Sequence, residues 1–167
     1  MGRGELATQG TCEGRSAAVP RDLRACLSPK GLRELITLEV SRLDWQNPDL
    51  VDYLKRYPAY RPQVLLSVLV FAYVTQEFES EAIAMACERE CEYRTLCYGS
   101  AIPAPDLIKF RRANRPLIEA VMARVLHQAV DPVQARRVGE FGSADGEHFL
   151  IEARRRLDIA RHLDTVD

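Results

Sequence analysis

The sequence has no excess of charge of either sign. Its 167 residues include 23 Lys and Arg and 24 Asp and Glu, so the formal net charge is −1. Bulk attraction to nucleic acid or to a membrane surface is therefore excluded, and any such contact must depend on a local cluster of charges. Lysine is scarce among the cationic residues, since 20 of the 23 are Arg.

Long apolar runs are also missing. The longest, from Val64 to Val74, has eleven residues and is interrupted only by Ser67, whereas a membrane span needs about 20. No apolar leader segment follows the first residues, and Leu6 stands where a myristoylation motif requires Ser or Thr. We therefore expect a cytoplasmic protein that does not associate with a membrane.

The cysteines form no C-x-x-C pair. They are odd in number and lie at positions 12, 26, 87, 91 and 97, which is typical of reduced thiols in a cytosol. Cys87, Cys91 and Cys97 are near enough in sequence to be weighed, together with His127, as metal ligands. Their spacing matches no zinc-binding pattern, and Cys is commonly buried. We interpret them as core residues and predict neither a metal nor a cofactor.

Catalytic motifs are absent as well. The three His, at positions 127, 148 and 162, are scattered, and no Ser-x-x-Lys, Gly-x-Ser-x-Gly or His-Glu-x-x-His arrangement occurs. The glycines between Gly139 and Gly146 mark a loop but lack the Gly-Lys-Ser/Thr ending of a phosphate-binding loop. We predict that the chain has no catalytic residues and is not an enzyme on its own.

Helical periodicity dominates what the sequence does contain, and no stretch alternates in the manner of a strand. We predict an all-α, compact multi-helix domain, with a flexible N-terminal arm over 1–27, a helical domain over 28–131, and a linker with a C-terminal helix over 132–167. The predicted helices cover about 28–47, 50–57, 62–76, 80–96 with Ser80 as N-cap, 105–131 with a kink or restart at Asn114–Pro116, and a final segment that carries Phe149, Ala153, Leu157, Ala160 and Leu163 on one side.

Charge is segregated along the chain. Glu77 to Glu92 contains six Glu and one Arg, whereas Lys109 to Arg115 contains four basic residues and no acid. The helices of these two segments form a predicted helix-turn-helix-like pair, whose second helix would enter a major groove of double-stranded DNA. The alternative is a solvated Arg face that pairs with the Glu run. The candidate DNA-binding residues are Lys109, Arg111, Arg112 and Arg115. On the helical wheel the three arginines point in a different direction from Leu107, Phe110 and Asn114.

Two further clusters are weaker candidates for contact with nucleic acid. The aromatic residues Trp45, Tyr53, Tyr57 and Tyr60 are interpreted as a packing cluster and not as a base-stacking platform, because no basic residues are interleaved with them. The run Arg154–Arg156 in the last helix is a second candidate patch for phosphate contact.

Four segments between Tyr60 and Leu126 together resemble a known family. They are Tyr60-Arg61-Pro62-Gln63-Val64-Leu65-Leu66, Phe78-Glu79-Ser80, Tyr93-Arg94-x-Leu96-Cys97 and Pro103-x-x-Asp106-Leu107-Ile108-Lys109-Phe110-Arg111-Arg112-x-Asn114. As a set they resemble the N-terminal helical domain of InsH-like insertion-sequence transposases of the DDE type. The resemblance implies binding to the terminal inverted repeats, with strand transfer left to a downstream domain in which three carboxylates hold two Mg²⁺ ions.

In that family the catalytic domain begins at an Asp-Gly pair, and Asp145-Gly146 falls at the corresponding place. The flanking residues favour a turn there and not a catalytic ligand, and a single carboxylate cannot hold a metal pair. We therefore expect the DNA-binding portion of a transposase, truncated or split and not catalytic alone, with transposon ends as its partner.

A second hypothesis comes from another class of protein. The near-zero net charge and the long apolar helix Pro62–Gln76 also suit a helical interaction module. Such a module would form a homo-oligomer, or would pair with a full-length transposase and inhibit it. The oligomeric state distinguishes the two hypotheses.

Overall fold

The computed structural model describes residues 19–47, 60–130 and 144–165, and every regular element within them is helical. This confirms the predicted all-α class. The predicted short helix over 50–57 and most of the predicted linker lie outside the described residues. The helices are η1 (Leu23–Ala25), α1 (Pro29–Ser41), α3 (Pro62–Val74), α4 (Ser80–Arg89), α5 (Cys91–Leu96), α6 (Ala104–Ala113), α7 (Arg115–Val130) and α9 (Ala144–Leu163).

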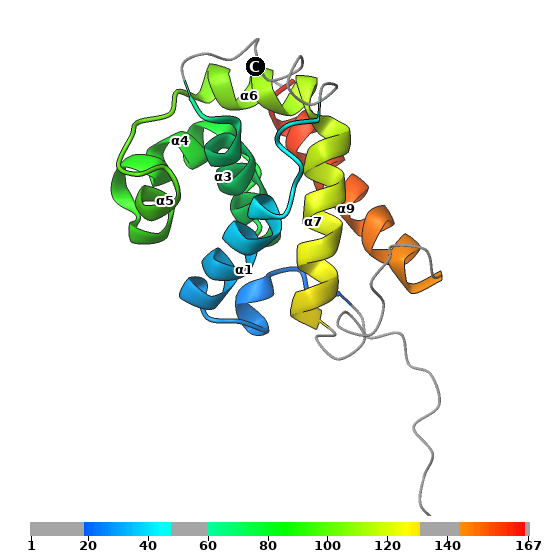
Figure 1. Cartoon of the computed structure of the whole chain (residues 1–167). Coiled ribbons are helices and arrows are strands. Elements are labelled where there is room, and N and C mark those ends of the chain that lie inside the picture. Colours follow the sequence, from blue (N-terminus) through cyan, green and yellow to red (C-terminus); the bar gives the residue numbers. More distant parts are fainter. Residues whose placement is uncertain (1–18, 48–59, 131–143, 166–167) are drawn as a thin grey trace, which may run out of the picture.

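Helix α3 forms the centre of the core. Every residue from Val64 to Val74 is buried, and α3 contacts α1, α5, α6, α7 and α9 (Figure 1). A helix that is apolar on all sides is expected in this position because it has no face to present to water. The long apolar helix therefore offers no surface to a partner, and the feature that motivated the interaction hypothesis does not support it.

Helix α1 begins as predicted. The Ser28 hydroxyl accepts a hydrogen bond from the Gly31 amide at 3.1 Å, and Pro29 occupies the first turn. The helix buries Leu32 and Ile36, together with the carboxylate of Glu39. Glu39 receives hydrogen bonds from Arg42 at 2.6 Å and from Gln128 of α7 at 2.5 Å, so its buried charge links α1 to α7.

The N-terminal arm was predicted to extend to residue 27, and this boundary is wrong. Leu23 in η1 has no exposed surface, and the Asp22 carboxylate caps the turn through the Arg24 amide at 2.8 Å. Gln76 also donates a hydrogen bond to the Arg21 carbonyl at 2.6 Å. Residues 19–27 thus belong to the packed fold. Although few of them are apolar, one buried leucine and these polar contacts hold the segment against the helices. Residues 1–18 lie outside the described part of the chain.

The predicted helix over 80–96 is two helices. Glu90 adopts an extended conformation, with φ −95° and ψ 135°, and separates α4 from α5. The break lets Tyr93 pack edge-on against Phe71 of α3, with ring centroids 5.1 Å apart. Ser80 is the first helical residue and not the N-cap, and its hydroxyl instead donates to Asp164 at 2.8 Å. Helices α4 and α6 contact each other, and α5 takes the place of the predicted turn between them.

Helix α9 packs lengthwise against α7 and is part of the same fold (Figure 1). Phe149, Ala153, Leu157 and Ala160 are buried, as predicted. Leu163, predicted on the same side, is 47% exposed. The reason is the helical phase: four residues after the buried Ala160, Asp164 takes the inward position, so Leu163 is turned toward solvent.

Candidate nucleic-acid interface

Helix α6 carries three of the four predicted DNA-binding residues. Pro103 precedes the helix in an extended conformation and Asp106 lies in its first turn, while Arg111 and Arg112 lie in its last turn. This order suits the helix dipole, which favours acids at the start and bases at the end. Helix α6 ends at Ala113. The next residue, Asn114, has a buried side chain that donates to the Phe110 carbonyl at 2.9 Å. Helix α7 then starts at Arg115.

Three of the four predicted residues lie at the surface. Lys109 and Arg112 are exposed, and Arg115 is partly exposed. Arg115 donates to the carboxylate of Asp158 in α9 at 2.8 Å. Arg115 lies at the junction between α6 and α7, which the C-terminal part of α9 also reaches (Figure 1).

Arg111 is not at the surface, and its predicted orientation is wrong. Only 3% of the residue is exposed, and its guanidinium is ion-paired with Asp164, the residue that follows α9. It also donates to the Tyr73 hydroxyl at 3.2 Å and to the Ser80 hydroxyl at 3.4 Å. At 3.6 residues per turn, a residue four positions after Leu107 is only about 40° away from it around the helix. Arg111 therefore belongs to the buried side, where it joins α3, α4, α6 and α9.

The buried cluster around Arg111 holds one charge pair in an apolar setting. Burial alone would lower the pKa of Arg111, but its contacts with Tyr73 and Asp164 prevail and raise it. Burial raises the pKa of Tyr73 to about 12, although the neighbouring guanidinium acts in the opposite direction. The tyrosine is therefore neutral at physiological pH, and the arginine serves to hold the helices together.

Helix α9 adds basic side chains that the sequence pattern did not assign to this surface. Arg161 lies 3.8 Å from the same Asp158 oxygen that binds Arg115. Arg154 pairs with Glu119 of α7 at 2.6 Å and keeps 60% of its side chain exposed. The packing of α9 on α7 brings these arginines next to side chains of α7, and no local pattern in the sequence indicates how the two helices pack.

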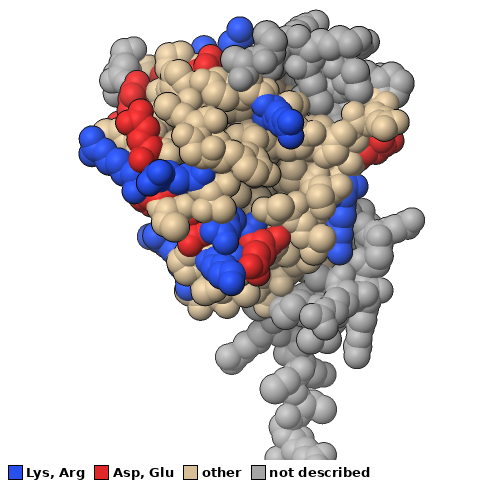
Figure 2. Space-filling model, turned by 60° about the vertical axis from the view of Figure 1, so that its left-hand side comes forward, with Lys and Arg blue, Asp and Glu red and all other residues tan. Residues whose placement is uncertain are grey.

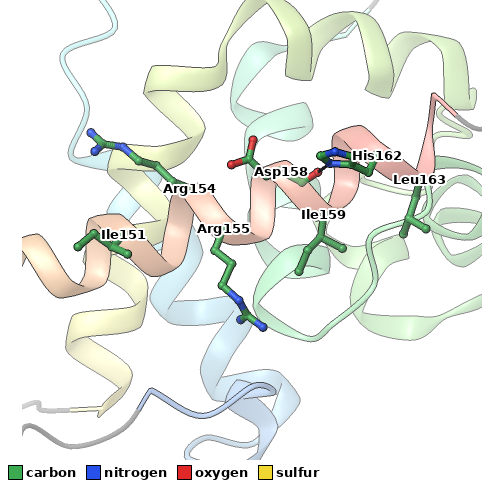
Figure 3. Close-up of a pocket in the computed structure, with 7 residues that line it drawn as sticks. All are labelled: Ile151, Arg154, Arg155, Asp158, Ile159, His162 and Leu163. Atoms are coloured by element: carbon green, nitrogen blue, oxygen red, sulfur yellow. Dashed lines mark hydrogen bonds between the residues drawn. The ribbon is translucent and has the colours of Figure 1, made fainter.

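The run Arg154–Arg156 is divided by the helical geometry. The side chains of Arg154 and Arg155 are 60% and 55% exposed, and Figure 3 shows them on the outer side of α9. The side chain of Arg156 has no exposed surface. Only two of the three arginines are therefore available to a phosphate.

Asp158 lies between the basic groups of α7 and α9. The hydrogen bond from Arg115 lowers the pKa of this carboxyl below its ordinary value of 3.8. Its negative charge offsets part of the positive charge of Arg115 and Arg161 and restricts where their guanidinium groups can lie. The surface is thus moderately basic, with two arginines oriented by one carboxylate.

The Glu run was expected, in the alternative interpretation, to pair with the Arg face of α6. Glu92 pairs instead with Arg33 of α1 at 2.7 Å. The partners of Arg111 and Arg115 are Asp164, which follows α9, and Asp158 of α9. On the face formed by α1, α4 and α5, acidic and basic side chains lie close together around a broad uncharged area (Figure 2). This face has no concentration of one sign.

No family model, curated protein or solved structure matches the chain. Any functional assignment therefore depends on the geometry of the surface around Asp158 and on the motifs that resemble the transposase family.

The residues weighed as metal ligands do not form a metal site. Among the described residues, no group of three His, Cys, Asp or Glu is placed to hold an ion. Cys97 directs its thiol toward the Cys87 carbonyl at 3.7 Å, and burial raises the pKa of Cys87 to about 12. His127 stacks on Phe149 with ring centroids 4.8 Å apart.

Asp145, the residue at the place of the family's first catalytic carboxylate, lies in the first turn of α9, where a loop turn was expected. None of the helices in the described ranges is long and apolar enough to cross a membrane.

Proposed function

We propose that the chain is a DNA-binding module, and that it corresponds to the non-catalytic N-terminal portion of an insertion-sequence transposase. The observation that carries the proposal is the pair of arginines, Arg115 of α7 and Arg161 of α9, that contact Asp158 beside the start of α7. Lys109 and Arg112 are exposed on the preceding helix α6. Guanidinium groups held in this way are suited to the phosphates of a DNA backbone.

The shared carboxylate also supports phosphate binding there. Asp158 contacts both Arg115 and Arg161, which keeps two guanidinium groups on the same side of the surface. Support for the transposase assignment comes from the motifs between Tyr60 and Asn114, which fall on the consecutive helices α3 to α6.

The proposal is tested by removing three of the surface charges together. We expect the variant Arg112→Ala, Arg115→Ala and Arg161→Ala to bind duplex DNA at least tenfold more weakly. The slope of log K against log salt should fall by about 0.9 for each phosphate that the variant no longer neutralises. Fluorescence anisotropy with a labelled duplex at several salt concentrations measures both quantities.

The matched control removes the same charge from another face. Lys30, Arg89 and Arg94 are exposed on α1, α4 and α5, and their triple Ala variant should keep the affinity and the salt slope of the parent. Equal reductions in affinity for the two triple variants would mean that binding depends only on overall charge, which would overturn the assignment of the surface.

The interaction hypothesis is supported by a different surface from the one that motivated it. Ile151 and Leu163 are 56% and 47% exposed, and together with Ile159 they line the outer side of α9 at spacings of eight and four residues (Figure 3). Rows of this kind pack against each other in helix pairs. In an antiparallel pair of two copies, Ile151 of one copy would lie opposite Leu163 of the other, so a second copy is the occupant that this face suits.

This second function predicts a dimer that is independent of DNA. Ile159→Glu would place a charge in the middle of the row and should convert a dimer to a monomer. Size-exclusion chromatography with light scattering measures the change, and Glu147→Gln, at an exposed position of the same helix, is the control. A parent chain that is monomeric at micromolar concentration would exclude this function and leave the DNA-binding proposal in place.

A further inference from the structure

Tyr98 is a large residue in the left-handed position that ends α5. It follows α5 with φ +52°, and the next residue, Gly99, has φ +73°. The Gly99 amide donates to the Arg94 carbonyl at 2.8 Å and closes the end of the helix. Gly or Asn usually occupies the left-handed position after a helix, because a larger side chain is sterically disfavoured there. The Tyr98 residue is also 82% exposed, so packing offers little compensation for the strain.

The Tyr98 ring borders an open hollow between the end of α5 and the start of α3. The hollow has a volume of about 460 Å³, which is enough space for a single nucleotide. A hydrogen bond of 3.0 Å from the Tyr60 hydroxyl to the Ala101 carbonyl fixes the loop after α5 to the start of α3. The lining residues are Tyr60, Arg61, Val64, Cys97, Tyr98 and Ser100.

The lining combines the groups that bind an unpaired nucleotide. An exposed phenol ring can stack on a base, and a guanidinium can contact the adjoining phosphate. From the sequence, Trp45 and Tyr60 were both interpreted as packing residues, and Trp45 does donate to the Val40 carbonyl at 2.9 Å. Tyr60 also packs against the core, as predicted, and the fold in addition brings Tyr98 next to Tyr60 and Arg61, which supplies the neighbouring ring and cation that the sequence pattern lacked.

The hollow is also connected to the helix that carries part of the proposed DNA surface. The loop that leaves it at Ser100 enters α6 at Ala104, and α6 carries Lys109 and Arg112 further along. A helix of 10 residues is about 15 Å long. The hollow and the exposed bases of α6 are thus separated along the chain by one short loop and less than the length of this helix.

We propose that this hollow binds an unpaired base at the end of a DNA duplex, with Tyr98 stacking on the base and Arg61 contacting its phosphate. The inference rests on the proposed DNA-binding function. It explains why a large aromatic residue stands where the backbone favours glycine, since the exposed ring serves a ligand and not the core.

The test compares two probes on the full chain, a blunt duplex and the same duplex with a short single-stranded overhang that carries 2-aminopurine. We expect the parent to bind the overhang probe about tenfold more tightly than the blunt one, with quenching of 2-aminopurine fluorescence. Tyr98→Gly should abolish the preference and the quenching and leave blunt-duplex binding unchanged. Because it relieves the left-handed strain, it should also raise the melting temperature, by about 2–4 °C.

Two further variants and a control define the role of the ring. Tyr98→Phe keeps the ring and should keep the overhang preference. Arg61→Ala should reduce the preference without removing the quenching, because the base would still stack. Met85→Ala, which shortens another exposed side chain (50% exposed), should change neither binding nor preference.

The outcomes separate the two proposals. A parent that binds both probes equally, or a Tyr98→Gly variant that keeps the preference, would overturn the inference about the hollow and leave the DNA-binding proposal standing. Binding of the overhang strand without binding of the blunt duplex would support the hollow and overturn the duplex surface. Binding of neither probe would overturn both.

Discussion

Replacing Arg111 with Met should lower the free energy of unfolding by about 3–5 kcal/mol, because the carboxylate of Asp164 would stay buried without its cationic partner. The Ser80 hydroxyl would keep its bond to Asp164, but the Tyr73 hydroxyl would have no guanidinium beside it. Arg112→Met, at the next position on the exposed side of α6, should change stability by less than about 0.5 kcal/mol. Urea denaturation followed by circular dichroism measures both values.

Each of the two substitutions should change only one property, Arg112→Met the DNA affinity and Arg111→Met the stability. Arg112→Met should weaken duplex binding, whereas Arg111→Met should leave the affinity of the folded fraction unchanged. The double variant Arg111→Met and Asp164→Leu should be more stable than Arg111→Met alone, since it removes the whole buried pair. If Arg111→Met were as stable as the parent and bound DNA poorly, the burial of this arginine would be contradicted.

Replacing Arg156 with Met should cost a similar amount, about 3–5 kcal/mol, because it removes a fully buried guanidinium together with its hydrogen bonds to one carboxylate and two backbone carbonyls. The Arg156 side chain has no exposed surface, and it donates to Glu152 at 2.9 Å, to the Tyr73 carbonyl at 3.0 Å and to the Pro20 carbonyl at 2.7 Å. Burial lowers the pKa of Arg156 and Glu152 opposes this effect, so the guanidinium remains charged. Methionine would leave two buried carbonyl groups without these donors.

A matched control for Arg156 lies beside it in the sequence. The Arg155 side chain is 55% exposed and pairs with Glu152 on the surface of α9, so Arg155→Met should cost less than about 1 kcal/mol. Arg156→Met should in addition speed hydrogen exchange at the amides of Cys26 and Leu27, which bond to the Leu23 carbonyl. Equal stability of the Arg155 and Arg156 variants would refute the assigned hydrogen bonds.

Local signals in the sequence predicted much of the fold. The Ser28–Pro29 start of α1 and the burial of Val64–Val74 in α3 follow from capping preferences and from a nearly continuous apolar run, which neighbouring helices do not alter. The start of α4 could not be placed in the same way, because the partner that draws Ser80 into the helix is Asp164, far away in the sequence. A hydroxyl can cap a helix or bind a distant acid, and only tertiary structure decides between them.

The candidate site was predicted less well than the fold, for a related reason. Basic residues were assumed to face solvent, although Arg111 falls beside Leu107 on the helical wheel and Arg156 falls between Ala153 and Ala160. Both positions carried the helical spacing of core residues, and this signal could have identified them. The contribution of Arg161 had no such signal, since it depends on how α9 packs against α7.

The bond from Arg156 to the Pro20 carbonyl has a consequence for folding during synthesis. Pro20 leaves the ribosome early, whereas Arg156 is in the last helix and emerges after all the other described elements. Pairing across this distance in the chain requires closure of a long loop, which slows folding. The N-terminal turn and the central helix therefore complete their packing only after the last helix has been synthesised. Before that point, a chaperone would encounter nascent chains that expose the apolar sides of α3 and α7.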